Sequence, residues 1–62
     1  MSMVEKFEQL KAIIHLAEED MVKFYKRGNK SAGIRLRRNL KEVKDITAEI
    51  RKEVLEMKRE KV

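Results

Sequence analysis

The sequence contains no cysteine and no proline, and it has only two glycines among 62 residues. The lack of cysteine excludes disulfide bonds, thiolate metal sites and a cysteine nucleophile, and it fits a reducing compartment. A single histidine cannot build a zinc site without thiolates or several converging carboxylates. Because chains below ~70–80 residues seldom bury enough apolar surface to be stable alone, oligomerisation is the stabilising device that remains.

Long apolar segments are also missing. The longest apolar runs span only a few residues, so no segment is expected to cross a bilayer. The first residues lack the apolar region of a secretory signal. We therefore expect a soluble, cytoplasmic protein that is not inserted in a membrane.

The sequence shows no pattern typical of an enzyme. A glycine-rich phosphate loop, a nucleophile elbow and metal-ligand spacing are all absent. Glu18, Glu19 and Asp20 are consecutive, so on a helix their carboxylates point around the axis and do not converge. We interpret His15 as a surface or interface residue, and we expect no catalysis, cofactor, metal or small-molecule substrate.

What the sequence has in quantity is charge: 44% of its residues are Asp, Glu, Lys or Arg, which together with the scarcity of helix breakers favours an all-α fold. Ser2 and Glu5 form a capping box that starts a first helix near residue 3, and Gly28 ends it after Arg27. A four-three spacing typical of a heptad places these apolar residues on one stripe: Met3, Phe7, Leu10, Ile14, Ala17, Met21 and Phe24.

A second helix with the same spacing follows, and Asn29 or Ser31 can cap its start. Its stripe consists of Leu36, Leu40, Val43, Thr47, Ile50, Val54 and Met57. Two long helices joined by so short a loop must run antiparallel. We therefore predict one domain over residues 1–62, an antiparallel two-helix hairpin spanning about 3–27 and 31–60, with the second helix extending past the first.

The apolar surface is wider than one partner helix can cover, because Ile13, Ile46 and Leu55 flank the stripes. Leu16, Val22 and Ile34 lie still further round the two helices. We expect the hairpin to assemble into a helical bundle or coiled-coil homo-oligomer, with a dimer as the favoured state.

Positive charge is concentrated around the turn. The net charge of the whole chain is +5, with −3 in residues 1–22, +8 in residues 23–44 and zero in residues 45–62. Cations at the start of the second helix oppose the helix dipole, at ~0.3–1 kcal/mol each, and this suggests that they serve an anionic ligand. The net charge favours a polyanionic partner, nucleic acid before membrane, and the candidate residues for binding it are Lys23, Lys26, Arg27, Lys30, Arg35, Arg37, Arg38, Lys41 and Lys44.

These side chains are spread out, which fits a row of phosphates better than a pocket for one small anion. With Leu36 and Val43 in the core, we expect Arg35 and Arg38 to point outward and Arg37, Lys41 and Lys44 to line one flank. No recognition-helix pattern surrounds Asn39, for which a buried or interfacial role is at least as plausible as a base contact. Gly33 can permit a close approach to the second helix.

The segment from Val22 to Glu53 resembles the bacterial histone-like nucleoid proteins first described in chlamydiae, often called linker-histone-like. The resemblance lies in the Gly28–Asn29–Lys30 turn with small residues after it, in Arg35–Leu36–Arg37, and in a Lys/Glu-rich helix ending in Ile50–Arg51–Lys52–Glu53. It implies sequence-tolerant binding of double-stranded DNA and compaction of the nucleoid. Chlamydial members continue into a long Lys/Ala/Pro-rich tail, and the present sequence contains no such segment. We therefore expect any compaction to come from the helical body.

Three other functions fit parts of the pattern. A homo-oligomeric coiled-coil adaptor for an acidic protein partner would use the same heptads and the same basic end. A basic amphipathic helix can bind membrane surfaces, although the balanced last segment and the low aromatic content count against that function. RNA stays open as a ligand, because phosphate contacts alone do not distinguish it from DNA.

Overall fold

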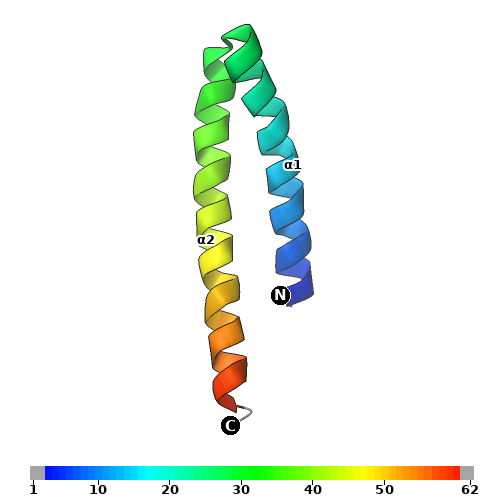
Figure 1. The fold of residues 1–62 in the computed structure, drawn as a ribbon, viewed down its shortest axis with the longest axis vertical. Helices are drawn as coiled ribbons and strands as arrows, with labels where there is room; N and C mark the ends of the chain where they lie inside the picture. The colour runs from blue at the N-terminus through cyan, green and yellow to red at the C-terminus, as the bar shows by residue number, and fades with distance from the viewer. Residues whose placement is uncertain (1–2, 61–62) are drawn as a thin grey trace.

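The computed structural model describes residues 3–60, which form an antiparallel hairpin of two helices and contain no strand. Helix α1 comprises Met3–Arg27 and helix α2 comprises Lys30–Glu60. The helices lie side by side, and α2 extends past the N-terminus of α1 (Figure 1). The predicted all-α hairpin is confirmed, and α2 begins one residue earlier than expected. Ser2 lies outside the described residues, so the capping box remains a prediction.

The turn is built by two residues. Gly28 has a φ of 67°, the left-handed conformation that glycine adopts without steric cost, and its N–H donates to the carbonyl of Phe24 at 3.1 Å. Asn29 caps α2, because its side-chain Oδ1 accepts the N–H of Ala32 at 3.1 Å. Of the two predicted caps, Asn29 is therefore the one that the structure uses.

The lack of a side chain at Gly33 allows a close contact beside the turn. A Cβ at this position would lie only 2.6 Å from Cδ1 of the Phe24 ring. The ring therefore occupies the space that a larger residue would need, and the predicted close approach at Gly33 is confirmed.

The seam between the helices is formed by residues spaced alternately three and four apart. Leu10, Ile13, Ile46 and Ile50 form its apolar centre, with Val43 packed against them. Ala17 and Ala32 extend the seam toward the turn, and Ala32 is fully buried. At both ends of the seam the inward positions are polar. Lys6 contacts Glu53 near the open end, and Asp20, which is 7% exposed, contacts Arg35 near the turn.

The predicted stripes are therefore wrong at every second position, where the inward residue is the one immediately before the residue that was predicted. Ile13 is buried where Ile14 was expected, and Ile46 is buried where Thr47 was expected. Phe7, Ile14 and Met21 are 50%, 42% and 44% exposed. The physical reason is that Lys6 and Asp20 occupy inward positions in ion pairs, which apolar spacing within one helix does not reveal.

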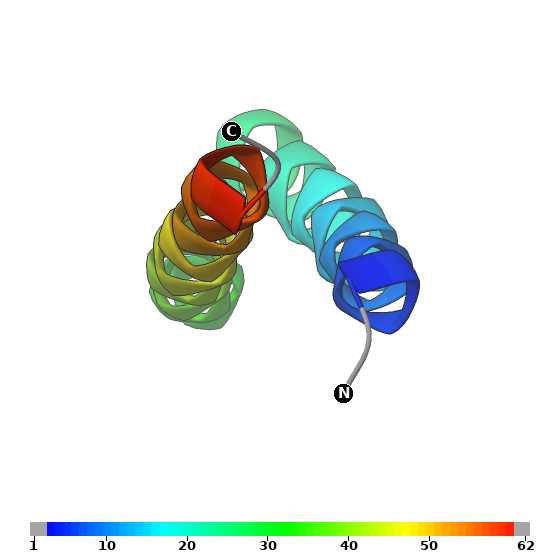
Figure 2. The same cartoon turned by 90° about the horizontal axis from the view of Figure 1, so that it is seen from below.

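The molecule is a thin rod with extents of 52 × 15 × 15 Å. Viewed along its length it is only two helices wide, so each helix keeps most of its circumference away from the other (Figure 2). All nine candidate cations lie on the segments that meet at the turn. The fold thus gathers in the half of the rod that contains the turn the charges that are spread over 22 residues of sequence.

Candidate nucleic-acid interface

The nine candidate cations differ in their surroundings, although the turn brings them to one half of the rod. Lys23, Lys26 and Arg27 lie in the last turns of α1, and the other six lie in the first half of α2. All are exposed except Lys23, which is half-buried. They lie in three environments: the side of the hairpin that carries Arg35, the opposite side, and the surface of α2 that faces away from α1.

On one side, Arg35 contacts α1 instead of pointing into solvent. Its Nε and Nη2 lie 3.2 and 3.1 Å from Oδ1 of Asp20, whose side chain is only 10% exposed. The predicted outward orientation of Arg35 is thus wrong. The reason is that a carboxylate buried between the helices requires a charged donor, and Arg35 is within reach of it.

The same side of the hairpin carries acids among its cations. A hollow beside Arg35 is lined by Leu16, Glu19, Asp20, Lys23, Arg35, Arg38, Asn39 and Glu42. Three cations here face three carboxylates, two of them supplied by α1. The residues between Val22 and Glu42 include no acid, so most of the balance on this side appears only when α1 folds against α2. Asn39 is half-buried, which fits the interfacial role considered for it.

Near the turn, the surface of α2 that faces away from α1 has a hollow lined by cations without acids. This second hollow is lined by Ile34, Arg37, Arg38 and Lys41. Among the residues that the structure describes, no ion pair involves Arg37 or Lys41. Their charges are therefore available to an external anion.

A third hollow lies at the turn on the side opposite Arg35, and it combines apolar and basic residues. It is lined by Phe24, Tyr25, Lys30, Gly33, Ile34, Leu36, Arg37 and Leu40. Tyr25 is 74% exposed and meets the Phe24 ring edge-on, with ring centroids 5.0 Å apart. The Tyr25 ring thus lies in the same hollow as Lys30 and Arg37.

The start of α2 is less open to anions than the sequence indicated. No acidic residue lies in its first turn, so the cations there do oppose the helix dipole. However, the Asn29 side chain already accepts the N–H of Ala32. One backbone N–H at the start of α2 is therefore already satisfied, and the exposed cations remain the feature that is open to an anion here.

Within the described residues there is no group of three or more His, Cys, Asp or Glu that could hold a metal ion. The His15 ring is an exposed surface group, 3.7 Å from a carboxylate oxygen of Glu19 on the same helix. None of the helices in the described segment is long and apolar enough to cross a membrane.

Sequence reasoning missed the ion pairs that join the helices. Lys6 of α1 contacts Glu53 of α2, and Glu49 lies 3.8 Å from the same ammonium. Together with the pair between Asp20 and Arg35, this contact brackets the apolar centre of the seam. The available signal was the spacing of Lys6 and Asp20 in step with Ile13, seven residues to either side of it.

Comparison with known proteins gives one family. The model of the family described as histone H1-like protein Hc1 matches residues 4–60, nearly the whole chain. No curated protein and no solved structure matches the chain.

Proposed function

The chain belongs to the histone H1-like Hc1 family, a DNA-binding and not an enzyme family, and on this premise we propose that it binds double-stranded DNA through the basic turn end of the hairpin. The observation that supports the proposal most strongly is the set of exposed cations around Ile34, where, among the described residues, Arg37 and Lys41 take part in no ion pair. The protein then acts at the nucleoid, in the cytoplasm. The resemblance noted in the sequence agrees with this family.

The contacts we propose are with phosphates and not with base edges. Lysine and arginine that replace the counterions of DNA give an affinity that falls with salt and depends little on sequence. Arg37, Arg38 and Lys41 are spread along the surface of a helix, so they suit successive phosphates. Arg35 is already paired with Asp20. We therefore expect it to contribute less to phosphate binding than Arg37, Arg38 and Lys41.

The finer part of the proposal is that the hairpin is a homo-oligomer, with a dimer favoured. Each helix has a row of exposed apolar residues one position after its inward row: Phe7, Ile14 and Met21 on α1, and Leu40 and Val54 on α2. Because the helices run in opposite directions, the same offset places both rows on one side of the hairpin. We call these five residues the outer apolar face.

Thr47 fits between Leu40 and Val54 without adding an unsatisfied polar group to this face. Its hydroxyl donates to the carbonyl of Val43 at 2.8 Å, within its own helix. The outer apolar face can therefore pack against a second copy without burying an unpaired donor.

The exposed area supports a partner of this kind. The hairpin exposes 5387 Å². A compact monomer of its mass, 7.4 kDa, would expose about 4,200 Å². The excess of about 1,200 Å² per copy corresponds to about 2,400 Å² in a two-fold dimer, within the range of obligate homodimer interfaces.

The experiment that tests this function measures binding of the purified protein to two duplexes of unrelated sequence, to a matched RNA duplex and to heparin, over a salt series, with oligomeric mass recorded alongside. We expect similar affinities for both duplexes and a steep loss with salt. Negligible duplex binding at low salt would reject the proposal and favour the adaptor for an acidic protein.

A further inference from the structure

Five cations recur along α2 at strict intervals of seven residues. They are Lys30, Arg37, Lys44, Arg51 and Lys58, and all five are exposed. Seven residues correspond to nearly two helical turns, so in a hairpin with a heptad seam these side chains stay on one surface of α2, outside the seam. Only the first three belong to the turn-end set. Arg51 and Lys58 continue the row to the other end of the rod.

The residues between these cations on the same surface are Ile34, Lys41, Ala48 and Leu55. None is acidic, so the surface carries basic and apolar residues alone from one end of α2 to the other. We call the nine residues the α2 ridge. A solvated helix surface normally mixes both signs of charge.

The equivalent outward surface of α1 shows that ordinary mixture. Its residues include Glu8, Lys11, His15 and Glu18. Lys11 lies 3.0 Å from Glu8, and His15 lies 3.7 Å from Glu19. The absence of acids is thus a property of the α2 ridge and does not follow from an outward position in this hairpin.

Two of the acids of α2 are drawn toward α1, on a side of α2 away from the ridge. Glu49 and Glu53 lie beside Lys6 of α1. Glu42 lines the hollow beside Arg35. In the described part of the chain, none of the five regularly spaced cations takes part in an ion pair. Their positive charge faces solvent without a neighbour that neutralises it.

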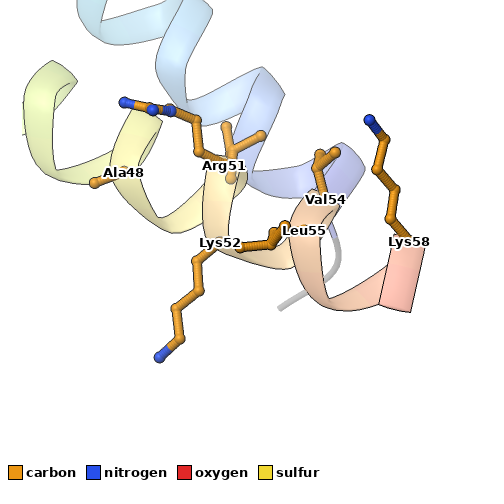
Figure 3. A pocket seen from close by; sticks show the side chains of 7 residues that line it. Ala48, Arg51, Lys52, Val54, Leu55 and Lys58 are labelled. Atoms are coloured by element: carbon orange, nitrogen blue, oxygen red, sulfur yellow. The ribbon is translucent and has the colours of Figure 1, made fainter. Parts of the chain in front are cut away.

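The far end of the ridge borders a hollow of its own. This hollow is lined by Ala48, Ile50, Arg51, Lys52, Val54, Leu55 and Lys58. Figure 3 shows Arg51 and Lys58 extending to the same side of α2 with Val54 between them, whereas Lys52 extends the other way. No acid lines the hollow, so it resembles the hollow around Ile34 near the turn.

We propose that the α2 ridge is a single phosphate-binding surface, and that Arg51 and Lys58 contact DNA together with the turn-end cations. This inference rests on the proposed function and extends it from the turn to the whole length of α2. At 1.5 Å per residue the cations are spaced by ~10.5 Å and span ~42 Å, somewhat more than one turn of B-DNA at ~34–36 Å. One hairpin can then follow a duplex over a full turn, which turn-end contacts alone cannot do.

The test compares three double variants that each remove two positive charges. The ridge variant, Arg51→Gln/Lys58→Gln, changes the far end of the ridge. The turn variant, Arg37→Gln/Lys41→Gln, changes the end of the ridge near the turn. The control variant, Lys11→Gln/Lys52→Gln, changes two residues outside the ridge. Affinity for a duplex of about 20 base pairs is measured by fluorescence anisotropy over a salt series, and helicity and oligomeric mass are checked for each variant. All six positions are exposed, so the fold should be kept.

We expect the ridge variant to bind about 3- to 30-fold more weakly at low salt and to lower the slope of log affinity against log salt by about 1–2. The control variant should change affinity by less than about threefold, because its charges lie off the ridge and are screened. The same variants are tested against vesicles containing phosphatidylglycerol, where we expect no ridge-dependent binding.

Equal losses in the ridge and control variants would overturn the inference, because net charge alone would then explain them. A ridge variant with unchanged affinity, beside a weakened turn variant, would also overturn it and leave the turn-end function standing. If the wild type binds no duplex, the proposed function fails first. Vesicle binding that depends on Arg51 and Lys58, without duplex binding, would assign the ridge to a membrane surface instead.

Discussion

The guanidinium of Arg35 holds the buried carboxylate of Asp20 across the two helices, with Nη2 3.1 Å and Nε 3.2 Å from Oδ1. Asp20 is the one charged residue among the described residues that is buried. A buried carboxylate that loses its donor keeps the full cost of desolvation. One of the nine candidate DNA-binding cations is therefore also a structural residue of the hairpin.

Arg35→Gln should destabilise the fold, whereas Arg37→Gln should leave its stability unchanged. The expected loss for Arg35→Gln is about 1–3 kcal/mol, because Asp20 is left without its charged partner. Thermal unfolding followed by circular dichroism at neutral pH measures both variants. Equal melting temperatures for the two variants would show that the contact between Arg35 and Asp20 contributes nothing to stability.

Gly33→Ala should lower the melting temperature, although alanine is ordinarily better than glycine in a helix by ~0.8–1.0 kcal/mol. The new Cβ would lie 2.6 Å from Cδ1 of Phe24, so the ring must leave its place. In a Phe24→Ala background the same substitution should raise stability by about 1 kcal/mol, because the obstacle is gone. A double-mutant cycle of unfolding free energies checks both signs. A gain in both backgrounds would contradict the close contact.

Lys6 should give the hairpin a stabilising contribution that disappears at high pH. Its hydrogen bond to Glu53 raises the pKa of the Lys6 ammonium above its ordinary 10.5, and the charges of Glu53 and Glu49 add to the effect while partial burial opposes it. Since the folded pKa is the higher one, the contribution is complete below 10.5 and is lost as pH rises through the raised pKa.

The measurement compares the melting temperatures of wild type and Lys6→Met from pH 7 to pH 12. Wild type should be the more stable protein at neutral pH, and the difference should shrink as the pH rises past about 10.5. A difference that stays constant to the highest pH would show that the aliphatic chain, and not the charge, accounts for the effect of Lys6.

The neighbouring residues Ile13 and Ile14 should respond differently to the same substitution. Ile13 is 8% exposed in the seam, and Ile14 is 42% exposed on the outer apolar face. Ile13→Asn should unfold the protein at all concentrations, because a polar group in the seam and a lost core side chain cost ~2–5 kcal/mol. Ile14→Asn should weaken association, so that the chain unfolds mainly on dilution. Sedimentation velocity and circular dichroism over a concentration series separate the two. An unchanged mass for Ile14→Asn would contradict the outer apolar face.

The helices and their ends could be predicted from the sequence because the signals for them are local. Gly28 and Asn29 determine the turn through their own backbone and side-chain geometry, without reference to distant residues. The phase of the seam could not be predicted in the same way. Ile13 and Ile14 are equally apolar, and the structure favours Ile13 because its row also contains Lys6 and Asp20, each paired on the other helix.

In the candidate interface, too, the local features could be predicted from the sequence, whereas the contacts between the helices could not. The sequence places the positive charge at the turn, but it does not show which cations meet an acid after folding. Arg35 faces Asp20, fifteen residues earlier in the chain, whereas Arg37 is without an acidic neighbour in its hollow. Arg51 and Lys58 recur regularly in the sequence, but residues 45–62 have a net charge of zero, so the charge of the segment does not reveal a basic surface.

The most direct test of the central claim is the salt dependence of duplex binding by the wild type and by Arg37→Gln/Lys41→Gln. If these cations hold phosphates, the variant should bind every duplex about 3- to 30-fold more weakly at low salt, and its slope against log salt should be smaller by about 1–2. A variant with the affinity and the slope of the wild type would remove the turn end from DNA binding and contradict the account.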